Sequence, residues 1–134
     1  MKWRQGLTLV ELFVVILVLS ILSTIAFTSF RKSVVNSRGK EARAMLNLIA
    51  QAEKMYKLEA GVYWPCSNTS DCNTLLDLSI PSGTSRAWEY RVKTRNSYTQ
   101  FCADAKCIQP NLRARDFYIQ DNIDEPIPGN CDGF

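Results

Sequence analysis

The feature that most constrains this chain is an unbroken apolar run from Leu7 to Phe30. The run contains neither Pro nor Gly, and its one charged side chain is Glu11. At about 1.5 Å of rise per residue, a helix of this length measures roughly 36 Å, whereas the hydrocarbon layer of a bilayer is about 30 Å thick. The sequence therefore predicts a helix that is long enough to span a membrane.

Glu11 is the unusual residue of this run, because an ionisable side chain inside a membrane costs on the order of 3 kcal/mol. Its helical neighbours offer no compensating charge, since they are Leu7, Thr8, Val14 and Val15. The compensating charge must come from outside the run. The nearest sources are the positive end of the helix dipole and a free α-amine created by cleavage before Leu7.

The residues around Glu11 resemble the N-terminus of the type IV pilin family, which includes the pseudopilins of type II secretion systems. A short basic leader ends at Gly6, and Leu-Thr-Leu-Val-Glu-Leu and the apolar helix follow. In that family a membrane-embedded prepilin peptidase cuts after the glycine and methylates the new amine. The resemblance implies cleavage between Gly6 and Leu7, methylation of Leu7, and pairing of Glu11 with the N-terminus of a neighbouring subunit.

Two features depart from the family pattern. The first residue after the glycine is most often Phe or Met in pilins, and here it is Leu7. Many pilins also carry a Gly and a Pro within the helix, at places that Ser20 and Thr28 occupy here. The resemblance covers residues 1–60 best.

The resemblance also implies partners and a location. The expected partners are copies of this chain or other pilin-like subunits, the prepilin peptidase, an inner-membrane assembly platform and the lipid bilayer. The chain is expected to cross the bacterial inner membrane once, with its N-terminus in the cytoplasm, and then to enter a periplasmic or cell-surface filament.

Other interpretations of the apolar run remain open. It could be an ordinary signal anchor, or a secretory signal whose apolar region ends near residues 24–26, although such regions usually span about 7 to 15 residues. A chain of the anchored kind would be a monomeric, membrane-anchored extracytoplasmic binding domain. Its helix would not be cleaved after Gly6.

The net charge of +3 is located at the two ends of the apolar run. Residues 33–134 contain equal numbers of acidic and basic side chains, so binding to nucleic acid is not expected. Basic residues flank the run on both sides and do not orient it. All five cysteines follow the run, which favours an oxidising compartment for this part of the chain.

The cysteines favour disulfides over metal, because the chain has no histidine and the spacings are wider than those of common zinc sites. Cys66 and Cys72 flank a polar turn and form the expected local pair. Among Cys102, Cys107 and Cys131 one thiol is left over. A local bridge from Cys102 to Cys107 would leave Cys131 free, whereas the resemblance to pilins, which often staple the C-terminal segment to the sheet, implies Cys131 paired with Cys102 or Cys107.

The rest of the chain predicts an α+β, pilin-like fold. Residues 1–6 form the leader, 7–30 the transmembrane and polymerisation helix, 31–60 its amphipathic continuation, and 61–134 a small disulfide-stapled head. The helix should end at Gly61 and pack one apolar stripe on an antiparallel sheet of about three strands. Alternation predicts strands at 88–95, 98–105 and 116–120, with a tight turn at 96–97 and a short helix at 74–78.

Apolar positions of the predicted stripe recur at spacings of three and four. They are Ala42, Met45, Ile49, Ala52 and Tyr56, joined by Leu46, Leu48 and Met55.

Charged residues of the head suggest binding rather than catalysis. Arg91, Lys93 and Arg95 share one strand face, and residues 116–134 hold five acidic side chains and no basic one. For the basic face we favour a solvated strand face that discourages edge-to-edge aggregation, and a patch for DNA, lipopolysaccharide or an acidic partner subunit is the alternative. For the acidic tail, we favour pairing with the basic strand face of another subunit. Calcium is an alternative, because major pseudopilins hold calcium in their C-terminal loops; no other cofactor is expected. Without histidine or a phosphate-binding Gly-rich loop, we expect no enzyme activity.

Overall fold

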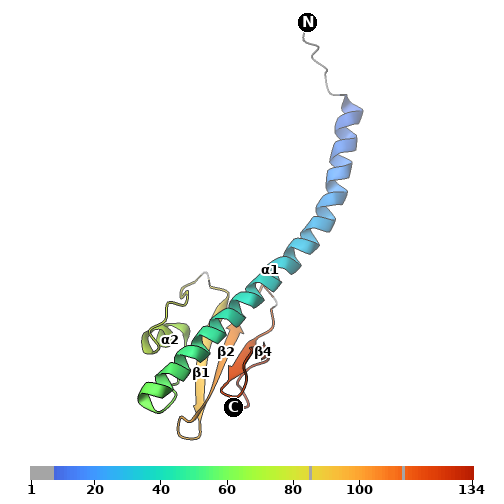
Figure 1. The fold of residues 1–134 in the computed structure, drawn as a ribbon. Coiled ribbons are helices and arrows are strands. Elements are labelled where there is room, and N and C mark those ends of the chain that lie inside the picture. The colour runs from blue at the N-terminus through green and yellow to red at the C-terminus, as the bar shows by residue number, and fades with distance from the viewer. Residues whose placement is uncertain (1–7, 85, 113) are drawn as a thin grey trace. The chain divides into compact units, whose positions relative to one another are not determined.

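The computed structural model describes residues 8–84, 86–112 and 114–134 (Figure 1). The chain divides into two compact units after Val34, and each is described by itself. The helix α1, Leu9–Ala60, contributes to both units. The described part of the N-terminal unit, residues 8–34, contains the apolar part of α1 and the four residues that follow it, which include Arg31 and Lys32.

The C-terminal unit, residues 35–134, packs the second half of α1 against an antiparallel sheet, as the sequence predicted. The sheet has four strands in the order β1-β2-β3-β4, one more than expected. The strands are β1 Trp88–Arg95, β2 Gln100–Cys107, β3 Phe117–Gln120 and β4 Ile127–Pro128. The missed strand is β4, which has only two residues, one of them a proline that cannot donate to a ladder.

The buried stripe of α1 differs in part from the predicted one. Ala42, Ile49 and Leu46 are buried as expected, whereas Leu48 and Met55 are exposed. Glu53 takes the next place on the stripe, and its side chain is fully buried. The helix-to-sheet contact is secured by the indole N–H of Trp88, which donates to the carbonyl of Arg38 at 3.0 Å.

The helix ends where the sequence places its end. Gly61 has φ +82°, and its N–H donates to the carbonyl of Lys57 at 2.8 Å. A glycine in the left-handed region is the usual residue after a helix, because it lacks the Cβ that disfavours this conformation.

Strand β1 alternates as predicted, with Trp88, Tyr90 and Val92 buried. Its partner β2 begins two residues later than predicted. The reason is the turn, in which Asn96, Ser97 and Tyr98 all have positive φ, so that Tyr98 belongs to the turn and not to the strand.

The short helix also lies earlier than predicted. It is α2, Thr69–Leu75, whereas the sequence placed it at 74–78. Asn68 caps it, because its side-chain oxygen accepts the N–H of Asp71 at 2.9 Å. The disulfide between Cys66 and Cys72 holds this helix beside β1, where Cys66 also forms a β-bridge with Val92.

Candidate functional site

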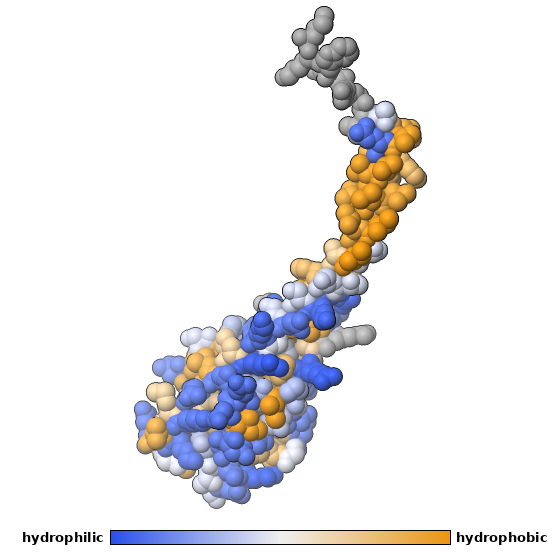
Figure 2. All heavy atoms as spheres, turned by 45° about the vertical axis from the view of Figure 1, so that its right-hand side comes forward, coloured by the Kyte–Doolittle hydropathy of each residue, from blue (hydrophilic) through white to orange (hydrophobic). Residues whose placement is uncertain are grey.

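The candidate site in the N-terminal unit is the exposed apolar surface of α1. Every large apolar side chain from Leu9 to Phe30 is between 46 and 84% exposed. Figure 2 shows this segment as a continuous hydrophobic surface. By length and composition the helix could span a membrane once. Such a surface requires lipid or other helices to cover it.

Four of the hydroxyl groups within this apolar surface donate hydrogen bonds to the helix itself. Ser20, Ser23, Thr24 and Thr28 each donate to a carbonyl three or four residues earlier, at 2.6 to 3.0 Å. These hydrogen bonds remove the cost of placing a free hydroxyl in an apolar medium. These four hydroxyl groups therefore do not prevent the segment from lying in a lipid environment.

Glu11 lies in the first turn of α1. The backbone N–H of Glu11 donates to the Thr8 hydroxyl at 3.2 Å, which is one half of a capping box. The other half, from the Glu11 carboxylate back to the N–H of Thr8, is absent in the described part of the chain. In that part the carboxylate has neither a hydrogen bond nor an ion pair.

Gly6 and Leu7, the predicted site of cleavage and methylation, lie outside the described residues. The proposed processing of the chain therefore rests on the sequence motif.

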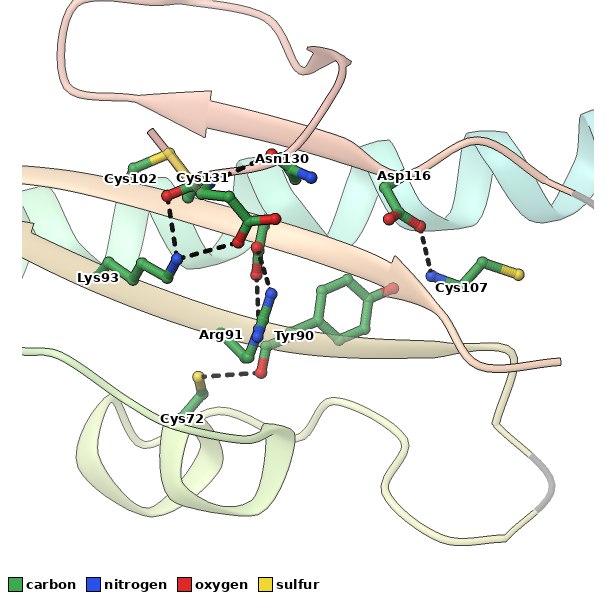
Figure 3. A network of polar contacts seen from close by, with 11 residues as sticks. Cys72, Tyr90, Arg91, Lys93, Cys102, Cys107, Asp116, Asn130 and Cys131 are labelled. Atoms are coloured by element: carbon green, nitrogen blue, oxygen red, sulfur yellow. Dashed lines mark hydrogen bonds and ion pairs between the residues drawn. A yellow bond between two sulfur atoms is a disulfide. The ribbon is translucent and has the colours of Figure 1, made fainter. Parts of the chain in front are cut away.

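In the C-terminal unit, the C-terminal segment is fastened to the outer face of the sheet (Figure 3). Cys131 forms a disulfide with Cys102 of β2, and the Lys93 ammonium donates to the carbonyl of Cys131 at 3.0 Å. Lys93 also pairs with Asp132 at 3.3 Å. Arg95 donates to the carbonyl of Gly133 at 3.2 Å.

This arrangement corrects one expectation. We expected the basic strand face to pair with the acidic tail of another subunit, whereas Lys93 and Asp132 pair within one chain. Arg91 is likewise engaged, because its guanidinium makes two hydrogen bonds to the carboxylate of Asp104, at 2.7 and 3.0 Å. These hydrogen bonds raise the pKa of Arg91 above its ordinary value.

The cysteines confirm the one definite predicted pair and settle the pairing that was left open. Cys66 and Cys72 are bridged, and Cys131 pairs with Cys102, one of the two partners that the resemblance allowed. Cys107 has a free, half-buried thiol. It lies opposite Trp88 in the β1–β2 register, on the sheet face that α1 covers, whereas Cys102 lies on the other face.

The described residues contain no group of three or more Cys, Asp or Glu side chains that could hold a metal ion. Two of the tail carboxylates have other roles, because Asp132 pairs with Lys93 and Asp116 accepts the N–H of Cys107 at 2.8 Å. The geometry of the described tail thus gives no support to the calcium alternative.

Sequence reasoning missed Glu53 as a buried acidic residue. One carboxylate oxygen accepts the N–H of Trp64 at 3.1 Å, and the other has no partner in the described part of the chain. Burial raises the pKa of Glu53 to about 7, although the hydrogen bond from Trp64 lowers it. The only sequence signal was its spacing of four from Ile49 on the apolar stripe.

Comparison of this chain with protein-family models, with curated proteins and with solved structures found no match.

Proposed function

We propose that this chain is a structural subunit of a pilin-like filament, either a type IV pilus or a type II secretion pseudopilus. The observation that carries the proposal is the carboxylate of Glu11 on an exposed apolar helix, which has no partner among residues 8–84, 86–112 and 114–134. Lipid tails or the apolar side chains of neighbouring helices can cover the apolar surface, but neither supplies a counter-charge for a glutamate within the apolar segment. A positive N-terminus of a neighbouring subunit would supply it.

The proposed assembly has two energetic parts. Burial of the apolar surface of α1 between neighbouring helices supplies adhesion, through close packing and the exclusion of lipid. The pairing of Glu11 with a neighbour's amine supplies register, because a carboxylate left unpaired in an apolar medium is strongly unfavourable. Cleavage after Gly6 would create that amine next to the helix, where it can reach a neighbouring Glu11.

The C-terminal unit fits the role of a rigid filament surface. Two disulfides hold its loop and its tail, and the sheet is covered on one face by α1. In the described residues, the buried carboxylates of Glu53 and Asp104 are engaged in structural contacts. This unit is suited to packing against similar units.

The test replaces Glu11 in the native host and measures processing and filament formation separately. Glu11→Ala and Glu11→Gln should leave membrane insertion and cleavage intact and abolish incorporation into filaments. Ser23→Ala is the matched control, because Ser23 lies on the same apolar surface and bonds only within the helix. Normal filaments from Glu11→Ala would contradict the proposal and favour a monomeric, membrane-anchored binding domain.

A further inference from the structure

An open basic groove lies in the C-terminal unit where α1 meets the start of β3. Its lining includes Lys40 and Arg43 of α1, Arg115, and the ring of Phe117. All three basic side chains are exposed. Within the described residues none of them forms an ion pair, and no carboxylate lines the groove.

One cation of the groove, Arg43, lies over an aromatic ring. The Arg43 guanidinium lies over the Phe117 ring, 4.9 Å from its centroid. The ring also lies close to Gly39, where an added Cβ would be 3.6 Å from it. A stacked guanidinium keeps its N–H donors free for a planar anion, and a carboxylate is such an anion. The groove is therefore suited to carboxylate groups.

An acidic loop lies at the opposite end of β3. Asp121, Asp124 and Glu125 follow the strand within five residues, and the last two are exposed. None of these carboxylates has an ion pair among the residues that the structure describes. Because Asp132 is already paired with Lys93, this loop holds the free acidic side chains of the C-terminal segment.

The two features lie at different ends of the C-terminal unit. The start of β3 contacts α1 at Gly39. At its other end, the N–H of Asp121 donates to the carbonyl of Phe101, whose ring is 4.7 Å from that of Tyr63, just beyond the end of α1. Four strand residues separate the two ends by about 10 Å. Groove and loop are thus about one strand length apart, and in the described residues no ion pair joins them.

We infer that the basic groove of one subunit receives the acidic loop, Asp121–Glu125, of a second copy of this chain. Complementary surfaces at opposite ends of one body form a head-to-tail contact that repeats from copy to copy and generates an open polymer. The inference rests on the proposed filament function and specifies one contact within it.

Charge reversal of the full chain in its native host tests this contact. Lys40→Glu with Arg115→Glu reverses the groove while leaving Arg43 on its ring, and Asp124→Lys with Glu125→Lys reverses the loop. Each pair of changes should lower the assembled fraction about tenfold at low ionic strength, because like charges then meet in every repeat. All four changes in one chain should restore assembly. Lys106→Glu, an exposed cation outside the groove, is the matched control.

Zero-length carbodiimide cross-linking of wild-type filaments provides an independent measurement. Filaments grown from mixed ¹⁴N- and ¹⁵N-labelled chains should yield a peptide in which Lys40 of one copy is joined to Asp124 or Glu125 of another. Full assembly of either charge-reversed chain, or failure of the fourfold variant to recover, would overturn the inference alone. A defect confined to the groove variant, without the cross-link, would mean that another anion occupies the groove and would also overturn it. Absence of wild-type filaments would overturn the proposed function as well.

Discussion

Glu53 accepts the backbone N–H of Trp64 at 3.1 Å and thereby ties α1 to the segment that follows Gly61. The carboxyl group is fully buried, and its second oxygen has no partner in the described residues. This single hydrogen bond offsets only part of the cost of burying a charge, so the pKa of Glu53 rises to about 7.

The buried carboxyl makes the stability of the C-terminal unit depend on pH. The pKa rises from 4.5 to about 7 on folding, so the folded state binds the proton more tightly. Its contribution to stability is complete below pH 4.5 and is lost as the pH rises through 7. Relative to wild type, Glu53→Gln should gain about 2 kcal/mol in free energy of unfolding between pH 5 and pH 8.

Urea unfolding of the full chain in detergent micelles, followed by tryptophan fluorescence, measures this difference at the two pH values. Glu59→Gln, at an exposed position of the same helix, controls for the change in net charge. If the difference in free energy of unfolding between Glu53→Gln and wild type is the same at pH 5 and pH 8, Glu53 does not titrate in this range.

Arg91 and Asp104 should respond unequally to substitution. The Asp104 side chain is 2% exposed and that of Arg91 is 30% exposed, so only Arg91 can reach water without its partner. Arg91→Met should lower the free energy of unfolding by about 3 kcal/mol, because it leaves a buried carboxylate unpaired. Asp104→Asn should lower it by about 1 kcal/mol. Lys93→Met is the control on the same strand face and should lower the free energy of unfolding by less than Arg91→Met, because the carboxylate that it leaves unpaired, Asp132, is exposed. The reverse order, measured by urea unfolding, would refute this assignment.

The two disulfides should contribute unequally to stability. Cys102 and Cys131 are 29 residues apart and Cys66 and Cys72 only six, so the first bridge closes a much longer loop. On chain-entropy grounds, Cys131→Ala should lower the free energy of unfolding by about 3.5 kcal/mol and Cys72→Ala by about 2 kcal/mol. Cys107→Ala, which breaks no bridge, should change it less than either. Thermal unfolding of the three oxidised variants ranks their stabilities. An equal loss of stability in Cys131→Ala and Cys72→Ala would contradict the dependence on loop length.

The sequence predicted those parts of the fold that depend on local patterns. Alternation placed β1 at its observed bounds, and Gly61 marked the end of α1. The start of α2 had a local signal as well, because Asn68 with Asp71 three residues later is a capping pattern. The prediction passed over that pattern and placed the helix five residues too late.

Features that depend on distant contacts were not predictable in the same way. The choice between Cys102 and Cys107 requires the sheet faces: once Phe101 and Ala103 face α1, alternation puts Cys107 on that face and Cys102 on the other. The buried carboxylate of Glu53 accepts the backbone N–H of Trp64. The two residues are 11 apart in the sequence, and no local pattern predicts this contact. The pairing of Lys93 with Asp132 spans 39 residues and follows from the disulfide beside it.

The intact mass of the protein from its native membranes, with fragmentation of the N-terminal peptide, tests the proposed processing and filament function. We expect a chain that begins at methylated Leu7, so that a positive amine lies next to the helix that carries Glu11. A chain that retains residues 1–6 in cells with an active prepilin peptidase would contradict it and favour an anchored binding domain. A chain that begins near Phe27 would contradict it equally, because the apolar helix would have been removed as an ordinary secretory signal.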